Sequence, residues 1–184
     1  WIGTPLPEGG RPADLGPVTL GARLASSESP GGYRLVYAKG AFILHMLRML
    51  MRNFNTGDET RFRAMMQDLV KSGAERPVTN RDFQDLVSRH MGEDMTWFFD
   101  NWVYSGGLPK VEITYTVKPA EKGVLFSGKS VTSQVPPGFR MPVPLTFVFR
   151  KGQVTGRFVV KSGTNQFDTL LPEMPQKVEF NPLE

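Results

Sequence analysis

The spacing of apolar residues changes once along this chain, near residue 108. Between residues 36 and 104, apolar side chains recur three and four positions apart, which is the spacing of amphipathic helices. After residue 110 they recur at every second position, as in half-buried strands. The loop-forming sequence Ser-Gly-Gly-Leu-Pro at residues 105–109 separates the two regions. We therefore expect a mixed α and β chain, with a helical half followed by a small antiparallel β-sandwich.

The helical half is predicted to contain a first helix from Val36 to Asn53 and three amphipathic helices after it. The first helix is apolar nearly all round, which is typical of a helix buried inside a larger assembly. The later helices each carry one apolar stripe. Their residues are Phe62, Met65, Met66, Leu69 and Val70; then Phe83, Leu86, Val87, His90 and Met91; then Met95, Phe98, Phe99, Trp102 and Val103.

Polar residues and glycines mark the predicted helix ends. Thr79 and Asp82 have the spacing of a capping box, and Asp94 can cap the last helix. Gly73 and Gly92 lie where left-handed glycines commonly end helices.

The β half begins with a strand in which Val111, Ile113, Tyr115 and Val117 alternate with polar residues. Leu145, Phe147 and Phe149 alternate in the same way, and Lys151-Gly152 fits a tight turn into a strand at residues 158–160. Further short strands are expected near residues 124–126, 167–171 and 178–180. The predicted organisation is an irregular lead-in at residues 1–32, a helical region at 33–108 and a β-sandwich at 109–184.

Composition excludes several classes of function. The chain is 40% hydrophobic and 22% charged, as in ordinary globular proteins, and its net charge of +4 is scattered rather than clustered. A nucleic-acid partner is therefore not expected. There is no cysteine, so thiolate metal sites and cysteine nucleophiles are excluded. The apolar run at residues 41–51 is too short to span a bilayer, so we expect no membrane segment. The cellular compartment stays undetermined.

The two histidines do not predict a metal site in this chain. His45 is followed by Met-Leu-Arg and His90 by Met-Gly-Glu, so neither begins a His-Glu-x-x-His motif. Zinc sites need three or four ligands at compatible spacing. Both histidines are interpreted as packing residues, and no bound cofactor is expected. A Gly-x-Ser-x-Gly elbow and a phosphate-binding loop are also missing from the sequence.

One further segment contains a candidate catalytic residue. This segment is Tyr37-Ala38-Lys39-Gly40, directly before the apolar helix. The segment at residues 37–48 resembles the region that follows the zinc site in M1 (gluzincin) aminopeptidases, where Tyr-x-Lys-Gly leads into an apolar helix. Later pieces resemble that family in the same order. They are residues 62–71, Pro77 to Phe83, Met95 to Trp102, Gly107-Leu108-Pro109 and Val178 to Pro182.

The resemblance implies a function for the protein to which this chain belongs. M1 aminopeptidases hydrolyse amino-terminal peptide bonds with a zinc ion held by His-Glu-x-x-His and a later glutamate. The tyrosine of Tyr-x-Lys-Gly stabilises the oxyanion of the tetrahedral intermediate, a role that maps onto Tyr37. The resemblance thus implies peptide substrates, zinc in the parent protein and Tyr37 as the catalytic residue, with the substrate-binding residues unknown.

The zinc ligands of that family lie upstream of the tyrosine, and no histidine precedes Tyr37 here. We therefore expect a carboxy-terminal portion that needs its upstream catalytic half as a partner and is inactive alone. The alternative interpretation is a non-catalytic helical and β-sandwich scaffold for protein interactions, in which Tyr37 is an ordinary aromatic anchor.

Overall fold

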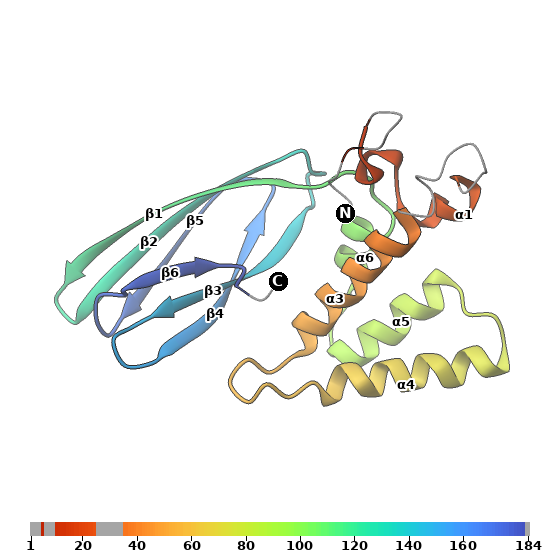
Figure 1. Cartoon of the computed structure of the whole chain (residues 1–184), viewed down its shortest axis with the longest axis horizontal. Coiled ribbons are helices and arrows are strands. Elements are labelled where there is room, and N and C mark those ends of the chain that lie inside the picture. The colour runs from red at the N-terminus through yellow and green to blue at the C-terminus, as the bar shows by residue number, and fades with distance from the viewer. Residues whose placement is uncertain (1–4, 6–9, 25–34, 183–184) are drawn as a thin grey trace. The chain divides into compact units, whose positions relative to one another are not determined.

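The structure is a computed structural model that describes residue 5, residues 10–24 and residues 35–182 (Figure 1). The chain divides into two compact units, Trp1–Leu108 and Pro109–Glu184. The first unit is helical and the second consists of antiparallel strands in two sheets. The predicted fold class, a helical half followed by a small β-sandwich, is confirmed.

The lead-in is more regular than predicted in the part that the structure describes. It forms the 3-10 turns η1 (Pro12–Leu15) and η2 (Val18–Leu20), followed by the short helix α1 (Gly21–Leu24). Pro12 opens η1, where its fixed φ favours a helical turn. The predicted irregular stretch at residues 25–32 lies outside the described residues.

Five helical elements follow within residues 35–108. They are the π-helical turn η3 (Leu35–Lys39), α3 (Gly40–Met51), α4 (Thr60–Glu75), α5 (Asn80–Met91) and α6 (Thr96–Trp102). Helices α4 and α5 lie side by side and are joined by a short loop (Figure 1). The last predicted stripe is fully buried, since Met95, Phe98, Phe99, Trp102 and Val103 are all at most 8% exposed.

The structure confirms the predicted caps of α5, whereas the N-cap position of α6 is Met95 rather than Asp94. Thr79 and Asp82 form a reciprocal capping box at the start of α5, and Gly92 ends this helix with φ of 75°. The Asp94 carboxylate accepts the Thr96 N–H at the start of α6. The prediction for Gly73 was wrong, because α4 continues to Glu75. Arg76 ends the helix in an extended conformation, which is the conformation that the following Pro77 imposes.

The apolar stripe of α4 is only partly buried. Met65 is inaccessible, Phe62, Met66 and Leu69 are half-buried, and Val70 is 69% exposed. The predicted stripe is therefore on the buried side of α4, but it also includes residues that are not buried in this chain.

The β unit contains two three-stranded antiparallel sheets, with strand orders β1-β2-β5 and β4-β3-β6 (Figure 1). The two sheets form the layers of a sandwich. The bounds of the strands are β1 (Lys110–Ala120), β2 (Gly123–Ser133), β3 (Arg140–Val148), β4 (Gln153–Lys161), β5 (Gly163–Leu171) and β6 (Lys177–Phe180).

The core of the sandwich is built from apolar residues of both sheets. Val124, Phe126 and Leu171 come from one sheet; Leu145, Phe147 and Phe149 come from β3 and its end. The Phe126 and Phe147 rings meet edge to face with centroids 4.9 Å apart. This geometry suits the ring quadrupoles and joins the two layers.

Two prolines lie inside β3, where a central strand would normally exclude them. Strand β6 pairs with β3 only from Leu145 onward, and Asn181 N–H donates to the Pro144 carbonyl just beyond the end of β6. Pro142 and Pro144 therefore occupy the part of β3 that β6 leaves unpaired, where a missing N–H costs no ladder hydrogen bond.

Candidate active site

The Tyr-x-Lys-Gly segment lies at the junction between η3 and α3. Residues 35–39 form a π-helical turn that leads directly into α3 at Gly40. Such turns are rare and are often found at functional sites. Tyr37 is the central residue of the turn, and its side chain is 73% exposed. The structure thus presents the predicted catalytic phenol on the surface of the helical unit.

Lys39 lies two residues later and is buried, with 2% exposure. It belongs to a buried stripe with four-residue spacing in η3 and α3, and all the remaining members of this stripe are apolar. The stripe consists of Leu35, Lys39, Ile43, Leu47 and Met51. The local sequence does not predict the burial of Lys39, because that burial depends on a partner far along the chain.

That partner is the backbone carbonyl of Ser105, which accepts a hydrogen bond of 2.6 Å from Lys39 Nζ. Burial lowers the pKa of the Lys39 ammonium from its ordinary value, because removal of water disfavours the charged form. A buried cation is costly unless it is hydrogen-bonded, so this contact offsets part of the cost. The hydrogen bond ties η3 to the loop after α6.

Two exposed apolar residues lie near Tyr37 in the sequence. Val36 is 37% exposed and Phe42 is 45% exposed, and both belong to the same η3–α3 segment as Tyr37. Only one stripe of α3 is buried in this chain, although its sequence is apolar nearly all round. Tyr37 therefore lies on a partly apolar wall whose uncovered side continues along α3.

The histidines are placed apart from each other in the helical unit. His45 is half-buried in α3, and His90 Nε2 lies 3.1 Å from Asp68 Oδ2, between α5 and α4. In the part of the chain that the structure describes, no three His, Cys, Asp or Glu residues come together as a group that could hold a metal ion. These residues therefore do not fit a zinc site, and no catalytic step is assigned to a metal here.

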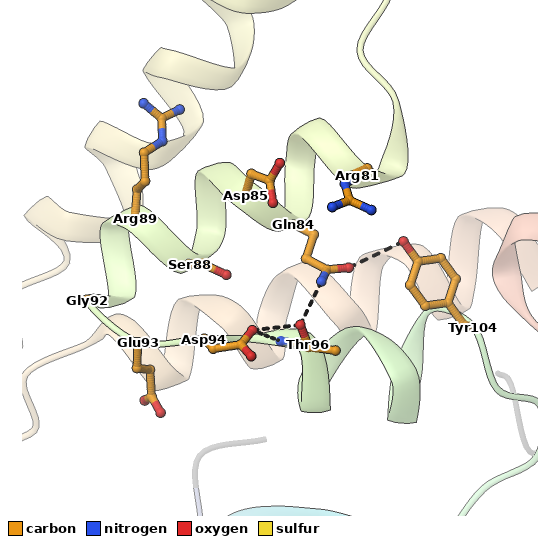
Figure 2. A pocket seen from close by; sticks show the side chains of 10 residues that line it. All are labelled: Arg81, Gln84, Asp85, Ser88, Arg89, Gly92, Glu93, Asp94, Thr96 and Tyr104. Carbon is orange, nitrogen blue, oxygen red and sulfur yellow. Dashed lines mark hydrogen bonds between the residues drawn. The ribbon is translucent and has the colours of Figure 1, made fainter.

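A broad open depression of about 730 Å³ lies between α5, α6 and the loop that joins them (Figure 2). Some of its polar side chains bond to one another. Tyr104 Oη donates to Gln84 Oε1 at 3.5 Å, and Gln84 Nε2 donates to Thr96 Oγ1 at 2.9 Å. Ser88 Oγ accepts the Met95 N–H, so this hydroxyl supports the backbone at the start of α6. Thr96 Oγ1 donates to Asp94 Oδ1 at 2.6 Å, a contact within the turn that precedes α6.

Among the helices of the described residues, none is both long and apolar enough to cross a bilayer.

Comparison with known proteins relates the fold to a peptidase. No protein-family model matches the chain, and no curated protein matches it. Among solved structures, the chain is similar to aminopeptidase A of Legionella pneumophila, determined in complex with aspartic acid, with a TM-score of 0.61 and 20% sequence identity. The similarity covers 77% of this chain but only 16% of that aminopeptidase. This chain thus shares the fold of a small part of an aminopeptidase.

Proposed function

We propose that this chain is the carboxy-terminal portion of a zinc-dependent M1-type aminopeptidase, in which Tyr37 stabilises the oxyanion formed during hydrolysis of the amino-terminal peptide bond. The zinc ion, its ligands and the general base belong to another part of the parent protein. The helical unit contributes Tyr37 and one wall of the active-site cleft. Alone, this chain has no peptidase activity.

The observation that carries the proposal is the placement of Tyr37. A phenol hydroxyl is a hydrogen-bond donor. It can therefore donate to a developing oxyanion without itself changing charge. The π-helical turn holds this side chain 73% exposed, next to a buried stripe that fixes the turn to the helical unit.

The similarity to a segment of an aminopeptidase supports the same proposal from the fold. So does the apolar side of α3, which includes Phe42 at 45% exposure. In the proposed parent protein this side packs against the zinc-binding part of the catalytic domain. The competing function, a non-catalytic scaffold, leaves Tyr37 without a chemical role.

The proposal is tested by Tyr37→Phe in the complete protein, with hydrolysis of an aminoacyl reporter as the assay. Loss of the hydroxyl removes a donor that acts in the transition state, so kcat is expected to fall by about 100- to 1000-fold, with KM changed far less. Bound zinc, measured by atomic absorption, is expected to stay at the wild-type level.

Tyr104→Phe is the matched control, since Tyr104 is a 40% exposed tyrosine of the same unit that bonds only to Gln84 among the contacts described above. Its kcat is expected to stay close to that of the wild type. Equal activity of Tyr37→Phe and Tyr104→Phe would refute the catalytic role of Tyr37. A complete protein without aminopeptidase activity would favour the scaffold function.

A further inference from the structure

Lys39 is a charged residue at a position of the η3–α3 stripe that should be apolar. Lysine is almost never fully buried unless it is paired, yet Lys39 is 2% exposed. No carboxylate contributes to the shift of its pKa, which is caused by burial alone. Its recorded partner is a neutral backbone carbonyl, that of Ser105. An aliphatic residue at this position would avoid the cost of burying a charge, so packing alone does not explain a lysine here.

The carbonyl that Lys39 contacts belongs to a fixed loop. Ser105 Oγ donates to the Asp100 carbonyl at 2.5 Å, and the Tyr104 N–H donates to the Phe99 carbonyl at 2.9 Å. Both acceptors are in α6, whose apolar residues form the buried core of the helical unit. The Ser105 carbonyl is thus held by the most completely buried helix of that unit.

The same loop also packs closely against the lead-in. A Cβ atom built on Gly106 would lie 3.0 Å from the Gly16 Cα and 3.2 Å from the Gly16 carbonyl carbon. That is closer than most real Cβ contacts, so the two backbones meet there without room for a side chain. The loop is therefore held on two sides, by α6 and by Gly16.

We propose that Lys39 is a positioning residue for Tyr37: its hydrogen bond to the Ser105 carbonyl fastens the π-helical turn to the loop after α6 and so fixes where the Tyr37 phenol lies. This inference rests on the proposed function for its catalytic consequence, but its structural content is independent of that function. Tyr37 and Lys39 belong to the same five-residue turn. Release of Lys39 frees the end of that turn, whereas the buried Leu35 still holds its start.

The structural content is tested by ¹⁹F NMR of the chain with 3-fluorotyrosine at its four tyrosines. The Tyr37 resonance is assigned by its loss in Tyr37→Phe. Lys39→Met, which keeps the aliphatic stem but removes the donor, is expected to shift and broaden the Tyr37 resonance and leave that of Tyr115, in the β unit, unchanged. Lys39→Arg retains a cationic donor and is expected to restore most of the wild-type spectrum.

Lys71→Met is the matched control, because Lys71 is an exposed lysine of α4 that pairs only loosely with Asp68, at 3.6 Å. It is expected to leave the Tyr37 resonance unchanged. If Lys39→Met does not fold, Gly106→Ala serves as a second variant. It disturbs the loop that contains the Ser105 carbonyl, the acceptor of the Lys39 hydrogen bond, and is expected to shift the Tyr37 resonance. A folded Lys39→Met chain with an unchanged Tyr37 resonance overturns the proposal, as does an equal shift of every tyrosine.

The catalytic consequence is tested by a double-mutant cycle in the complete protein. Misplacement of a catalytic group by about 1 Å can cost about 100-fold in rate, so Lys39→Met is expected to lower kcat by about 10- to 100-fold with little change in KM. In a Tyr37→Phe background the same substitution is expected to have little further effect, because the hydroxyl that it positions is absent.

The outcomes separate the two proposals. If Tyr37→Phe lowers kcat, and Lys39→Met lowers kcat by the same factor with and without the Tyr37 hydroxyl, the positioning role is refuted. The proposed function is then still supported. If Tyr37→Phe leaves kcat unchanged, the proposed function falls, and the ¹⁹F spectra still decide whether Lys39 positions Tyr37.

Discussion

Gly128 shows how the absence of one side chain shapes the core of the sandwich. It lies on the inner face of β2, directly opposite Phe167 of β5. A Cβ atom at Gly128 would lie 2.1 Å from the Phe167 ring. That ring in turn stacks on Phe158 of the other sheet, with centroids 4.2 Å apart. Gly128 therefore leaves the space in which the two phenylalanines meet.

We predict that Gly128→Ala destabilises the β unit. The added methyl group overlaps the Phe167 ring and forces it away from Phe158, and overpacking of this kind typically costs about 1–3 kcal/mol. The free energy of unfolding is measured by urea denaturation. Gly156→Ala is the control, because no atom lies within 4 Å of a Cβ at Gly156 in β4. Equal unfolding midpoints for the two variants would contradict this account of the core.

The residues of the candidate site differ in how well their roles could be predicted from the local sequence. Tyr37 could be singled out, since the Tyr-x-Lys-Gly pattern and its position before an apolar helix are local features. Lys39 belongs to the same pattern, but its burial could not be predicted, because it depends on the Ser105 carbonyl, 66 positions later in the chain. Contacts over such separations follow from tertiary packing, which residue spacing does not encode.

At the scale of the elements, the start of α5 has a fully local explanation. Thr79 Oγ1 accepts the Asp82 N–H at 3.1 Å, and the Asp82 carboxylate accepts the Thr79 N–H at 2.9 Å. Two N–H groups that a helix leaves unpaired at its start are thereby satisfied. Arg76 also binds Asp82, at 2.6 Å. This arrangement links the end of α4 to the start of α5.

Thr79→Ala is expected to lower the free energy of unfolding by about 1 kcal/mol, because the Asp82 N–H loses its acceptor. Thr79→Ser retains the hydroxyl and is expected to stay within a few tenths of a kcal/mol of the wild type. Thermal and urea unfolding measure both. An alanine variant as stable as the serine variant would show that the capping box contributes nothing.

The Asp82 carboxyl group makes the stability of the folded state depend on pH. The Arg76 guanidinium, followed by the Thr79 hydroxyl, holds the pKa of the Asp82 carboxyl well below its usual range. A carboxyl group with a lowered pKa in the folded state stabilises that state above its unfolded pKa, about 4, and loses this effect as the pH falls.

The stability difference between the wild type and Asp82→Asn is therefore predicted to be largest near pH 7 and to shrink as the pH falls below about 4. Urea midpoints of both proteins at pH 7 and at low pH test this. Comparison with the asparagine variant cancels the titration of the other groups. A difference that is the same at both pH values would contradict the role of the charged carboxylate.

The sequence predicted the elements most accurately where packing follows one simple period. The stripe from Met95 to Val103 is buried as expected, because α6 is surrounded by its own unit. The first half of β3 escaped prediction, since Pro142 and Pro144 argue against a strand. They are tolerated there only because β6 is short, which is a property of the sheet rather than of the local sequence.

At the scale of the whole chain, the change of period near residue 108 matches the division into two compact units at Leu108 and Pro109. The fold is similar to part of an aminopeptidase, of which this chain covers 16%. The active site proposed here is correspondingly incomplete: one exposed phenol, its anchor and a partly apolar wall. In our proposal, the zinc ion, its ligands and the general base belong to another part of the parent protein.

The central claim is that this chain is completed by a zinc-binding catalytic half, and the most direct measurement is the coding sequence upstream of the Trp1 codon. The account predicts an in-frame His-Glu-x-x-His motif followed by a further glutamate, several tens of residues before Tyr37. An upstream coding region without that motif would contradict it, and Tyr37 would then be an aromatic anchor on a non-catalytic scaffold.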